Sequence, residues 1–338
     1  MSKNYPIDFV VTWVDGNDPI WQAEKAKYSP NKNADNRNVR FRDWDNMQYW
    51  FRAVEKFAPW VNKIHFVTYG HLPKWLNIDN PKLNIAKHSD FIPQKYLPTF
   101  SSQPIELNLH RINGLAERFV YFNDDMFLLR PVKRELFFAG KDCLPTDFAI
   151  TSTISTTTKE DMMPFIKLNC VTILNGHFDK KEQMKKHFSK WVNLAYGWNA
   201  LRNLIFYGQH RFKGFANNHL AFSFLKSEYE DIWEKEYESL DDTSSHKFRS
   251  KLDLDNWLIR YWQLTRGNFY PIGRHVKGKV YEIYNGVEQN QELFKIIENQ
   301  AMPMICINDN DNVDFEPMKE RIKQAFNKIL PEKSSFEK

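Results

Sequence analysis

The feature that most constrains the fold is an apolar run, residues 119–122, that ends in an amide and two adjacent carboxylates. The run Phe-Val-Tyr-Phe is typical of a buried strand, and Asn123, Asp124 and Asp125 follow it directly. Neighbouring carboxylates are costly to desolvate unless a cation or a proton compensates them. A hard divalent cation beside a diphosphate explains the pair most economically, and a turn capped by its own side chains is the alternative.

Two further apolar segments end in polar clusters in the same way. These clusters are Asp15 and Gly16 after residues 7–14, and Asn308 and Asp309 after residues 302–307. In open α/β sheets, ligands bind beyond the carboxyl ends of the strands. If the three strands are parallel in one sheet, their polar ends converge on one edge, which can hold a nucleotide diphosphate and its metal.

Strand and helix patterns alternate along the first third of the chain, with strands at 63–68 and 83–86 and a helix at 45–56. This alternation predicts an α/β protein with a mostly parallel, doubly wound sheet, Rossmann-like and GT-A-like, and with a helical insertion. Further helices are expected at 105–117, 179–206, 221–237, 254–265, 289–298 and 316–330.

One predicted helix, residues 105–117, carries a polar stripe. Glu106, His110 and Asn113 are spaced four and three residues apart, so they share one helix face. We expect that face to point toward the strand that carries Asp124 and Asp125. The alternative is that the stripe is only a solvated surface.

Basic residues and missing motifs narrow the class of ligand. Arginine suits the oxygens of phosphate, and candidates to compensate the acids are Arg40, Arg42, Arg111 and Arg249. The sequence has no GxxxxGK[ST] loop and no GxGxxG fingerprint after the first strand, which disfavours P-loop kinases and nicotinamide enzymes. The formal charge of +5 fits an anionic substrate or an anionic membrane surface, whereas the interspersed acids and the absence of zinc-finger, KH or RNP patterns disfavour nucleic acid.

The expected setting is a reducing cytoplasm. Cys143, Cys170 and Cys306 are isolated thiols without CxxC spacing, which disfavours disulfides and zinc. No apolar stretch is long enough to span a bilayer, and the start lacks the apolar segment of a secretory signal. A basic helix face with Lys180, Lys181, Lys185, Lys186 and Lys190, together with the final helix, could contact the inner face of the cell membrane, and ordinary surface helices are the alternative.

Several blocks are specific enough in order and spacing to indicate a family. They are residues 10–19, 40–43, 58–61, 97–102, 109–115 and 123–125, then His219 with residues 246–250, and finally residues 307–310. Together they resemble the Stealth family of sugar-phosphate transferases, which includes bacterial capsular and exopolysaccharide phosphotransferases and the animal lysosomal-enzyme N-acetylglucosamine-1-phosphotransferase. The resemblance covers nearly the whole chain.

The resemblance implies transfer of a sugar 1-phosphate from a nucleotide sugar, a UDP-hexose or UDP-N-acetylhexosamine, to a hydroxyl of a saccharide acceptor, free or lipid-linked, with release of UMP. The implied catalytic residues are Asp125, His219 as leading candidate for the base, Arg249 and Arg111. The implied substrate-binding residues are Trp13, Asp15, Gly16, Arg40, Arg42, His110, Asn123 and Asn308. Mg²⁺ or Mn²⁺ is expected on Asp124, Asp125 and Asp309.

The expected organisation has four parts: a nucleotide-sugar-binding α/β half at 1–132, a largely helical insertion and acceptor region at 133–270, a return to the α/β core with a final helix at 271–330, and a disordered tail at 331–338. Two other functions stay open. One is a metal-dependent glycosyltransferase that releases UDP, and the other is a non-catalytic carbohydrate-binding module, which the high aromatic content would suit.

Overall fold

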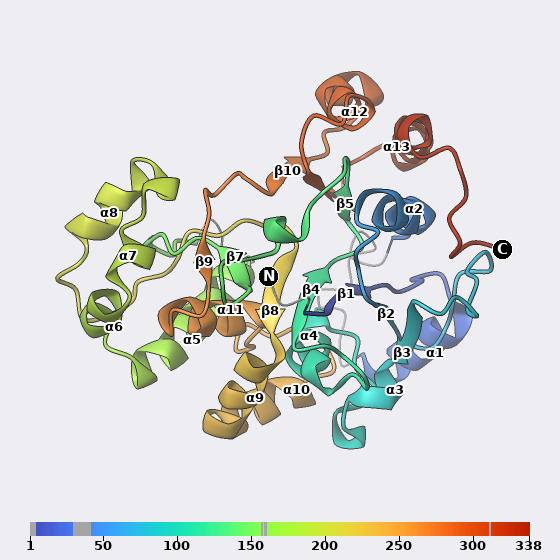
Figure 1. The fold of residues 1–338 in the computed structure, drawn as a ribbon. Coiled ribbons are helices and arrows are strands. Elements are labelled where there is room, and N and C mark those ends of the chain that lie inside the picture. Colours follow the sequence, from blue (N-terminus) through green and yellow to red (C-terminus); the bar gives the residue numbers. More distant parts are fainter. Residues whose placement is uncertain (1–4, 30–41, 157, 159–160, 311) are drawn as a thin grey trace.

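A five-stranded sheet forms the centre of the molecule (Figure 1). The computed structural model describes residues 5–29, 42–156, 158, 161–310 and 312–338. The strands of the central sheet, in spatial order, are β3 (Leu83–Lys87), β2 (Ile64–Thr68), β1 (Ile7–Thr12), β4 (Arg118–Phe122) and β8 (Phe222–Leu225). The first four are parallel to one another, and β8 is antiparallel to β4. The prediction of a mostly parallel sheet is confirmed.

The central sheet is covered on both faces, as its unbroken apolar strands require. Side chains alternate along β1, so Phe9 and Val11 belong to one hydrophobic core and Val10 to the other. The strand order runs 3-2-1 and then turns to β4, which places a topological switch point between β1 and β4. The doubly wound arrangement therefore directs attention to the carboxyl ends of these two strands.

Helices from both ends of the chain pack on one face of the sheet. This layer contains α2 (Met47–Phe57), α12 (Gln291–Glu298) and α13 (Phe315–Ile329), whose buried residues share one core with β1. On the opposite face lie α4 (Ser102–Asn108), α5 (Met163–His177), α9 (Lys226–Lys235), α10 (Tyr237–Ser245) and α11 (Asn256–Thr265). The remaining short elements are α1 (Pro19–Tyr28), α3 (His88–Phe91) and the 3₁₀ turns Gln94–Tyr96, Arg134–Leu136 and Val287–Asn290.

A second sheet corrects one prediction about the acidic clusters. Its order is β10 (Gly278–Glu282), β11 (Met304–Asn308) and β5 (Met126–Leu128), with β5 antiparallel to β11. The three strands that end in acids are therefore not parallel members of one sheet. The chain reverses after β4 and enters β5 through residues 123–125, which we call the acidic loop. The end of β11 therefore still meets this loop, where Ile307 N donates to the carbonyl of Asp125 at 2.9 Å.

The insertion is more broken than its pattern predicted. The expected helix at 179–206 is instead α6 (Lys180–Lys186), α7 (Phe188–Trp191), a 3₁₀ turn (Leu194–Tyr196) and α8 (Asn199–Ile205). Gly197, with φ +56°, separates the turn from α8, since this backbone angle is unfavourable for other residues. A small sheet of β6 (Phe138–Ala139), β7 (Leu144–Asp147) and β9 (Tyr270–Pro271) lies beside these helices.

Two other predicted helices are wrong in part. The expected helix at 221–237 begins as strand β8, because Phe222 and Phe224 pair with β4 before α9 starts. The expected helix at 105–117 ends at Asn108, whose side-chain amide donates to the Pro104 carbonyl at 2.8 Å. A 3₁₀ turn at Leu109–Arg111 follows, so Glu106, His110 and Asn113 do not share a helix face.

The tail at 331–338 is ordered, contrary to expectation. Phe336 is buried and packs against Phe51 with ring centroids 5.2 Å apart. Glu337 forms a salt bridge with Arg52 at 2.7 Å, and the Lys338 amide donates to the Trp75 carbonyl at 2.8 Å. The tail composition is polar enough to suggest disorder, but a single aromatic side chain and one ion pair attach it to α2.

Candidate active site

A polar cleft lies beyond the carboxyl ends of β1 and β4, at the switch point of the sheet. We call it the acidic cleft, and its volume is about 520 Å³. Its lining brings together Trp13 after β1, Asp124 and Asp125 after β4, Asn308 and Asp309 after β11, and Arg42, Asp43 and Trp44 before α2. Two of the three predicted acid clusters thus converge, through strands of two different sheets, whereas the third, at Asp15, does not line this cleft.

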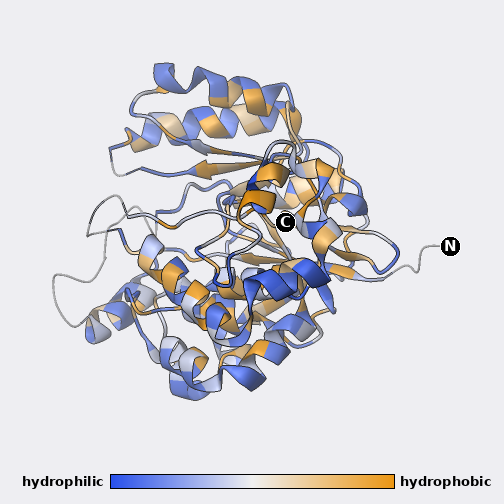
Figure 2. Cartoon of the chain, turned by 90° about the vertical axis from the view of Figure 1, so that its left-hand side faces the viewer, coloured by the Kyte–Doolittle hydropathy of each residue, from blue (hydrophilic) through white to orange (hydrophobic). Residues whose placement is uncertain are grey.

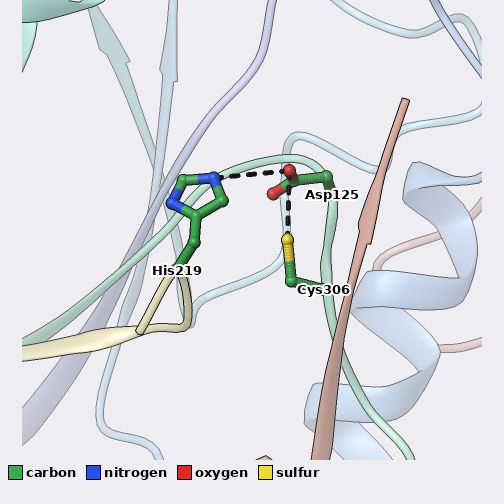
Figure 3. A group of neighbouring side chains, drawn as sticks. All are labelled: Asp125, His219 and Cys306. Carbon is green, nitrogen blue, oxygen red and sulfur yellow. Dashed lines mark hydrogen bonds and ion pairs between the residues drawn. The ribbon is translucent and has the colours of Figure 1, made fainter. Parts of the chain in front are cut away.

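Asp125 lies between His219 and Cys306 in this cleft (Figure 3). Its Oδ2 atom accepts from the Cys306 thiol at 3.3 Å and lies 3.6 Å from Nε2 of His219. Its Oδ1 atom is buried and has no hydrogen-bond partner among the described residues. A buried carboxylate oxygen without a donor is costly, so this atom is available to a ligand or a cation.

His219 reaches the acidic loop from the segment before β8. Its side chain is 42 % exposed, and its Nε2 atom also lies 3.4 Å from the Asn123 amide nitrogen. Burial lowers the pKa of His219, but the bond to Asp125 and the charges of Asp125 and Glu106 outweigh burial, so that the pKa is raised. An exposed imidazole whose charged form is favoured by Asp125 and Glu106 is suited to receive a proton from a substrate hydroxyl.

Asp124 sits at the open side of the same loop. Enclosure by protein atoms, followed by the charges of Asp125 and Asp43, raises the pKa of Asp124 to about 7. The residue is exposed in the cleft, so solvent screens part of this repulsion. Three carboxyl groups within mutual range indicate a site that a cation would stabilise.

Arg42 and Asp309 form a bridge between the two halves of the chain. The Arg42 guanidinium donates to both Asp309 oxygens at 2.7 to 3.0 Å, and the Trp44 indole donates to the same carboxylate at 3.0 Å. The guanidinium also lies over the Phe315 ring, 4.5 Å from its centroid. Asp309 is therefore in the predicted place, but its oxygens are already engaged. Arg40 lies outside the described residues.

A second cleft adjoins the first and shares Trp13 and Asp124 with it. We call it the aromatic cleft, and its volume is about 250 Å³. It is lined largely by rings and hydroxyl groups, including Trp21, Phe100, Phe248, Ser101, Ser102, Thr12, Tyr121, Glu106, Asn123 and Arg249. The Phe100 and Phe248 rings are stacked, with centroids 5.4 Å apart. Flat apolar walls with a few polar groups are typical of ligand sites.

Arg249 provides the positive charge of the aromatic cleft. It donates to Ser102 Oγ at 3.2 Å and to Gln103 Oε1 at 3.3 Å. Glu106 is buried nearby and accepts from the Tyr121 hydroxyl at 3.3 Å. Burial raises the pKa of Glu106, and the charge of Arg249 offsets part of that rise. Arg249 thus lines the same cleft as Asp124, where its guanidinium could contact an anion.

Five of the predicted site residues that the structure describes do not line either cleft. One is His219, which contacts the site through Asp125 at 3.6 Å, and the others are His110, Arg111, Asp15 and Gly16. His110 is buried against the Tyr229 ring at 5.6 Å, and burial lowers the pKa of His110 to about 3. Arg111 is exposed, lies 4.7 Å from the Trp233 ring centroid and donates to Asn108. Asp15 accepts from the Asn17 amide, and Gly16 lines a neighbouring pocket with Arg42 and Asp43. The predicted Asn308 does line the acidic cleft and donates to Glu282 at 2.7 Å.

Other residues of the site were not singled out from the sequence. Asp43 and Phe248 lie within the family blocks 40–43 and 246–250, next to Arg42 and Arg249. This position in the sequence could have indicated that they belong to the site. Cys306 carried no such signal. It reads as an isolated thiol in a strand, and only the antiparallel pairing of β5 with β11 brings it to Asp125.

The protein is a doubly wound α/β protein with carboxylates, a histidine and arginines at the switch point of its sheet. This combination is typical of enzymes that bind phosphate-bearing ligands. Comparison with known proteins is more specific. Residues 5–33 match the family model of Stealth protein CR1, conserved region 1, and residues 40–144 match Stealth protein CR2, conserved region 2. The chain belongs to the Stealth family, and it is a phosphotransferase.

Relatives support this along the full chain. The chain is 42 % identical over 343 residues to the capsular polysaccharide phosphotransferase WcwK of Streptococcus pneumoniae, with 100 % of both chains covered. It is 40 % identical to the receptor polysaccharide phosphotransferase WefC of Streptococcus gordonii, with 98 % of both covered. Among solved structures, the galactosyltransferase LgtC with donor and acceptor sugar analogues matches with a TM-score of 0.36 and 9 % identity over 94 % of this chain and 95 % of that one. That similarity is too low to carry an argument about the site.

Proposed function

We propose that the enzyme transfers a sugar 1-phosphate from a nucleotide sugar, a UDP-hexose or UDP-N-acetylhexosamine, to a saccharide hydroxyl and releases UMP. The polysaccharide phosphotransferases that match its full length support polymer synthesis, in a capsule or another cell-surface polysaccharide. The observation that carries the proposal is the gathering of His219, Asp125 and Arg249 around a loop shared by two clefts. Such a site can hold a donor diphosphate and an attacking hydroxyl at once.

In the proposed reaction, the aromatic cleft takes the nucleotide, and the acceptor saccharide enters through the acidic cleft. The acceptor oxygen attacks the phosphorus that bears the sugar, and the bond from that phosphorus to the bridging oxygen of the diphosphate breaks. The hydroxyl proton passes to Nε2 of His219, while Arg249 stabilises charge on the diphosphate oxygens. The products are a phosphodiester and UMP.

The residues of the acidic loop fit a divalent cation. Asp125 offers a buried oxygen without a donor, and Asp124 is destabilised by its acidic neighbours. The ligand atoms of Asp125, His219 and Cys306 lie within 4.8 Å of one another, but burial and the charge of Asp125 raise the pKa of the Cys306 thiol, which keeps it protonated. We therefore assign Mg²⁺ or Mn²⁺ to Asp124 and Asp125, where it would neutralise charge on the diphosphate.

Removal of divalent metal is expected to abolish turnover. The carboxylates would then repel the donor diphosphate, so the loss should be complete within the sensitivity of a nucleotide-release assay, and Mg²⁺ or Mn²⁺ should restore activity. Metal content before and after chelation is measured by elemental analysis, and circular dichroism checks that the fold is kept. Full turnover by verified metal-free enzyme would exclude the assignment.

The proposed reaction is tested by product analysis with a panel of UDP-sugars and a saccharide acceptor. Release of UMP is expected, because the nucleophile attacks phosphorus and the sugar phosphate moves as one unit. Release of UDP would mean attack at the anomeric carbon and hence an ordinary glycosyltransferase. Binding of sugars without nucleotide release would leave only a carbohydrate-binding role.

We further propose that the enzyme works in the cytoplasm, on an acceptor that is free or lipid-linked. Among the described residues, the helices are too short or too polar to cross a bilayer.

A further inference from the structure

The short helix α8 buries a polar side chain and exposes apolar ones, which is the reverse of a helix packed on a protein core. Its buried face carries Asn203, whose side chain bonds to the Thr151 amide at 2.7 Å and to the carbonyls of Ala149 and Trp191 at 2.5 Å. Its solvent face carries Leu201, Leu204 and Ile205, with exposures of 50 %, 48 % and 77 %. A helix that buries its amide and exposes its aliphatic side chains indicates that something else covers the apolar face.

The apolar surface continues into the preceding turn. Leu194 is 96 % exposed and Trp198 is 87 % exposed. Backbone hydrogen bonds from Gly197 to Leu194, from Ala200 to Gly197 and from Leu201 to Trp198 connect the turn with α8. We call this set the apolar ledge: Leu194, Trp198, Leu201, Leu204 and Ile205. The ledge lies at one end of the molecule, and Figure 2 looks onto that end, where hydrophobic and hydrophilic residues are intermixed on short helices.

The ledge is set in the most basic part of the chain. Residues 179–213 contain eight Lys and Arg against two acidic residues, Asp179 and Glu182, a net of +6, whereas the whole chain carries +5. The exposed cations are Lys181, Lys185 and Lys186 on α6, Arg202 on α8, and Arg211 and Lys213 after it. The two helices are adjacent, because Lys180 on α6 donates to the Phe206 carbonyl at the end of α8.

The helices that were expected to face a membrane differ from that expectation in the structure. Lys180 and Lys190 turn inward, and Lys190 Nζ donates to the carbonyls of Gly267 and Phe269. The apolar stripe of α13 is buried in the core, as the alternative interpretation held. In the segment 180–190 the exposed apolar side chain is Phe188, at 46 %, whereas Leu194, Trp198 and Ile205 of the ledge are 77 to 96 % exposed.

We propose that the apolar ledge docks on an anionic lipid bilayer, with its aliphatic and indole side chains between the head groups and its surrounding Lys and Arg against acidic lipids. An exposed tryptophan beside aliphatic residues suits the membrane interface. A second copy of this chain fits less well, because two such surfaces would bring like charges together. The inference does not depend on the proposed reaction, although a lipid-linked acceptor would be presented at the same surface.

The test is co-sedimentation of the full chain with phosphatidylcholine vesicles that contain or lack phosphatidylglycerol, without any nucleotide sugar. Binding is expected only with phosphatidylglycerol and should weaken as salt rises. Trp198→Ser with Ile205→Ser should weaken it by about tenfold, and Lys181→Glu with Lys185→Glu and Lys186→Glu by about tenfold or more.

The matched control is Ile78→Ser with Val276→Ser, which removes apolar side chains of 52 % and 50 % exposure elsewhere on the surface and should leave vesicle binding unchanged. Circular dichroism checks each variant for folding. The inference is overturned if the parent does not bind anionic vesicles at low salt, if the control weakens binding as much as the ledge variants, or if the ledge variants change only self-association in sedimentation velocity.

Discussion

Replacement of Asp125 by Asn is expected to lower turnover by about 100-fold or more, since several kcal/mol of transition-state stabilisation depend on its charge. The amide keeps the size of the side chain but removes the proposed cation ligand and the charged partner of His219, whose Nε2 lies 3.6 Å away. The measurement is steady-state UMP release at saturating metal. Because Asp125 also accepts from Cys306, thermal unfolding is followed in parallel.

Asp79→Asn is the matched control, because Asp79 is exposed in a loop far from the acidic loop in sequence, and it should leave turnover unchanged. Loss of folding in Asp125→Asn would make this acid structural. Turnover close to that of the parent would remove it from the reaction.

Arg249→Lys should cost about 1–3 kcal/mol in the transition state, roughly a 5- to 150-fold loss in kcat/KM. Lysine keeps the charge but cannot reproduce the fork that contacts Ser102 and Gln103 and is presented to the aromatic cleft. Initial-rate kinetics with varied donor provide the measurement. The loss should be absent in Arg111→Lys, because Arg111 lies over Trp233, outside both clefts. Unaltered kinetics in the Arg249 variant would place this residue outside the site.

The parts of the fold that the sequence predicts correctly depend on local pattern. The strands around Val10 and Val120 read as buried because both of their faces are apolar, and the parallel sheet follows from the helices between them. What fails is pairing over long distances. β11 has the same apolar pattern as β4, and nothing in that pattern says that it pairs with β5 instead of joining the central sheet. The prediction of a disordered tail fails for a similar reason, because Phe336 packs against Phe51, which is far away in the sequence.

The site shows the same division. Asp124, Asp125 and Asp309 line one cleft, as expected because acids that follow buried strands have no role in a core, whereas their role as metal ligands stays a prediction. The positions of His219 and Arg249 beside that loop were implied by family resemblance, not by spacing. His110 shows the limit of helix periodicity, since the helix ends before it and the ring turns into the core against Tyr229. Sequence gives residue types and approximate places, whereas side-chain direction depends on where each helix stops.

The two side chains that separate the acidic cleft from the aromatic cleft have a consequence for the kinetics. Trp13 and Asp124 border both spaces, so molecules bound on either side are separated by little more than these two side chains. In the proposed reaction, two substrates held in this way would react with each other directly in a ternary complex, and no enzyme side chain would need to carry the sugar phosphate in between.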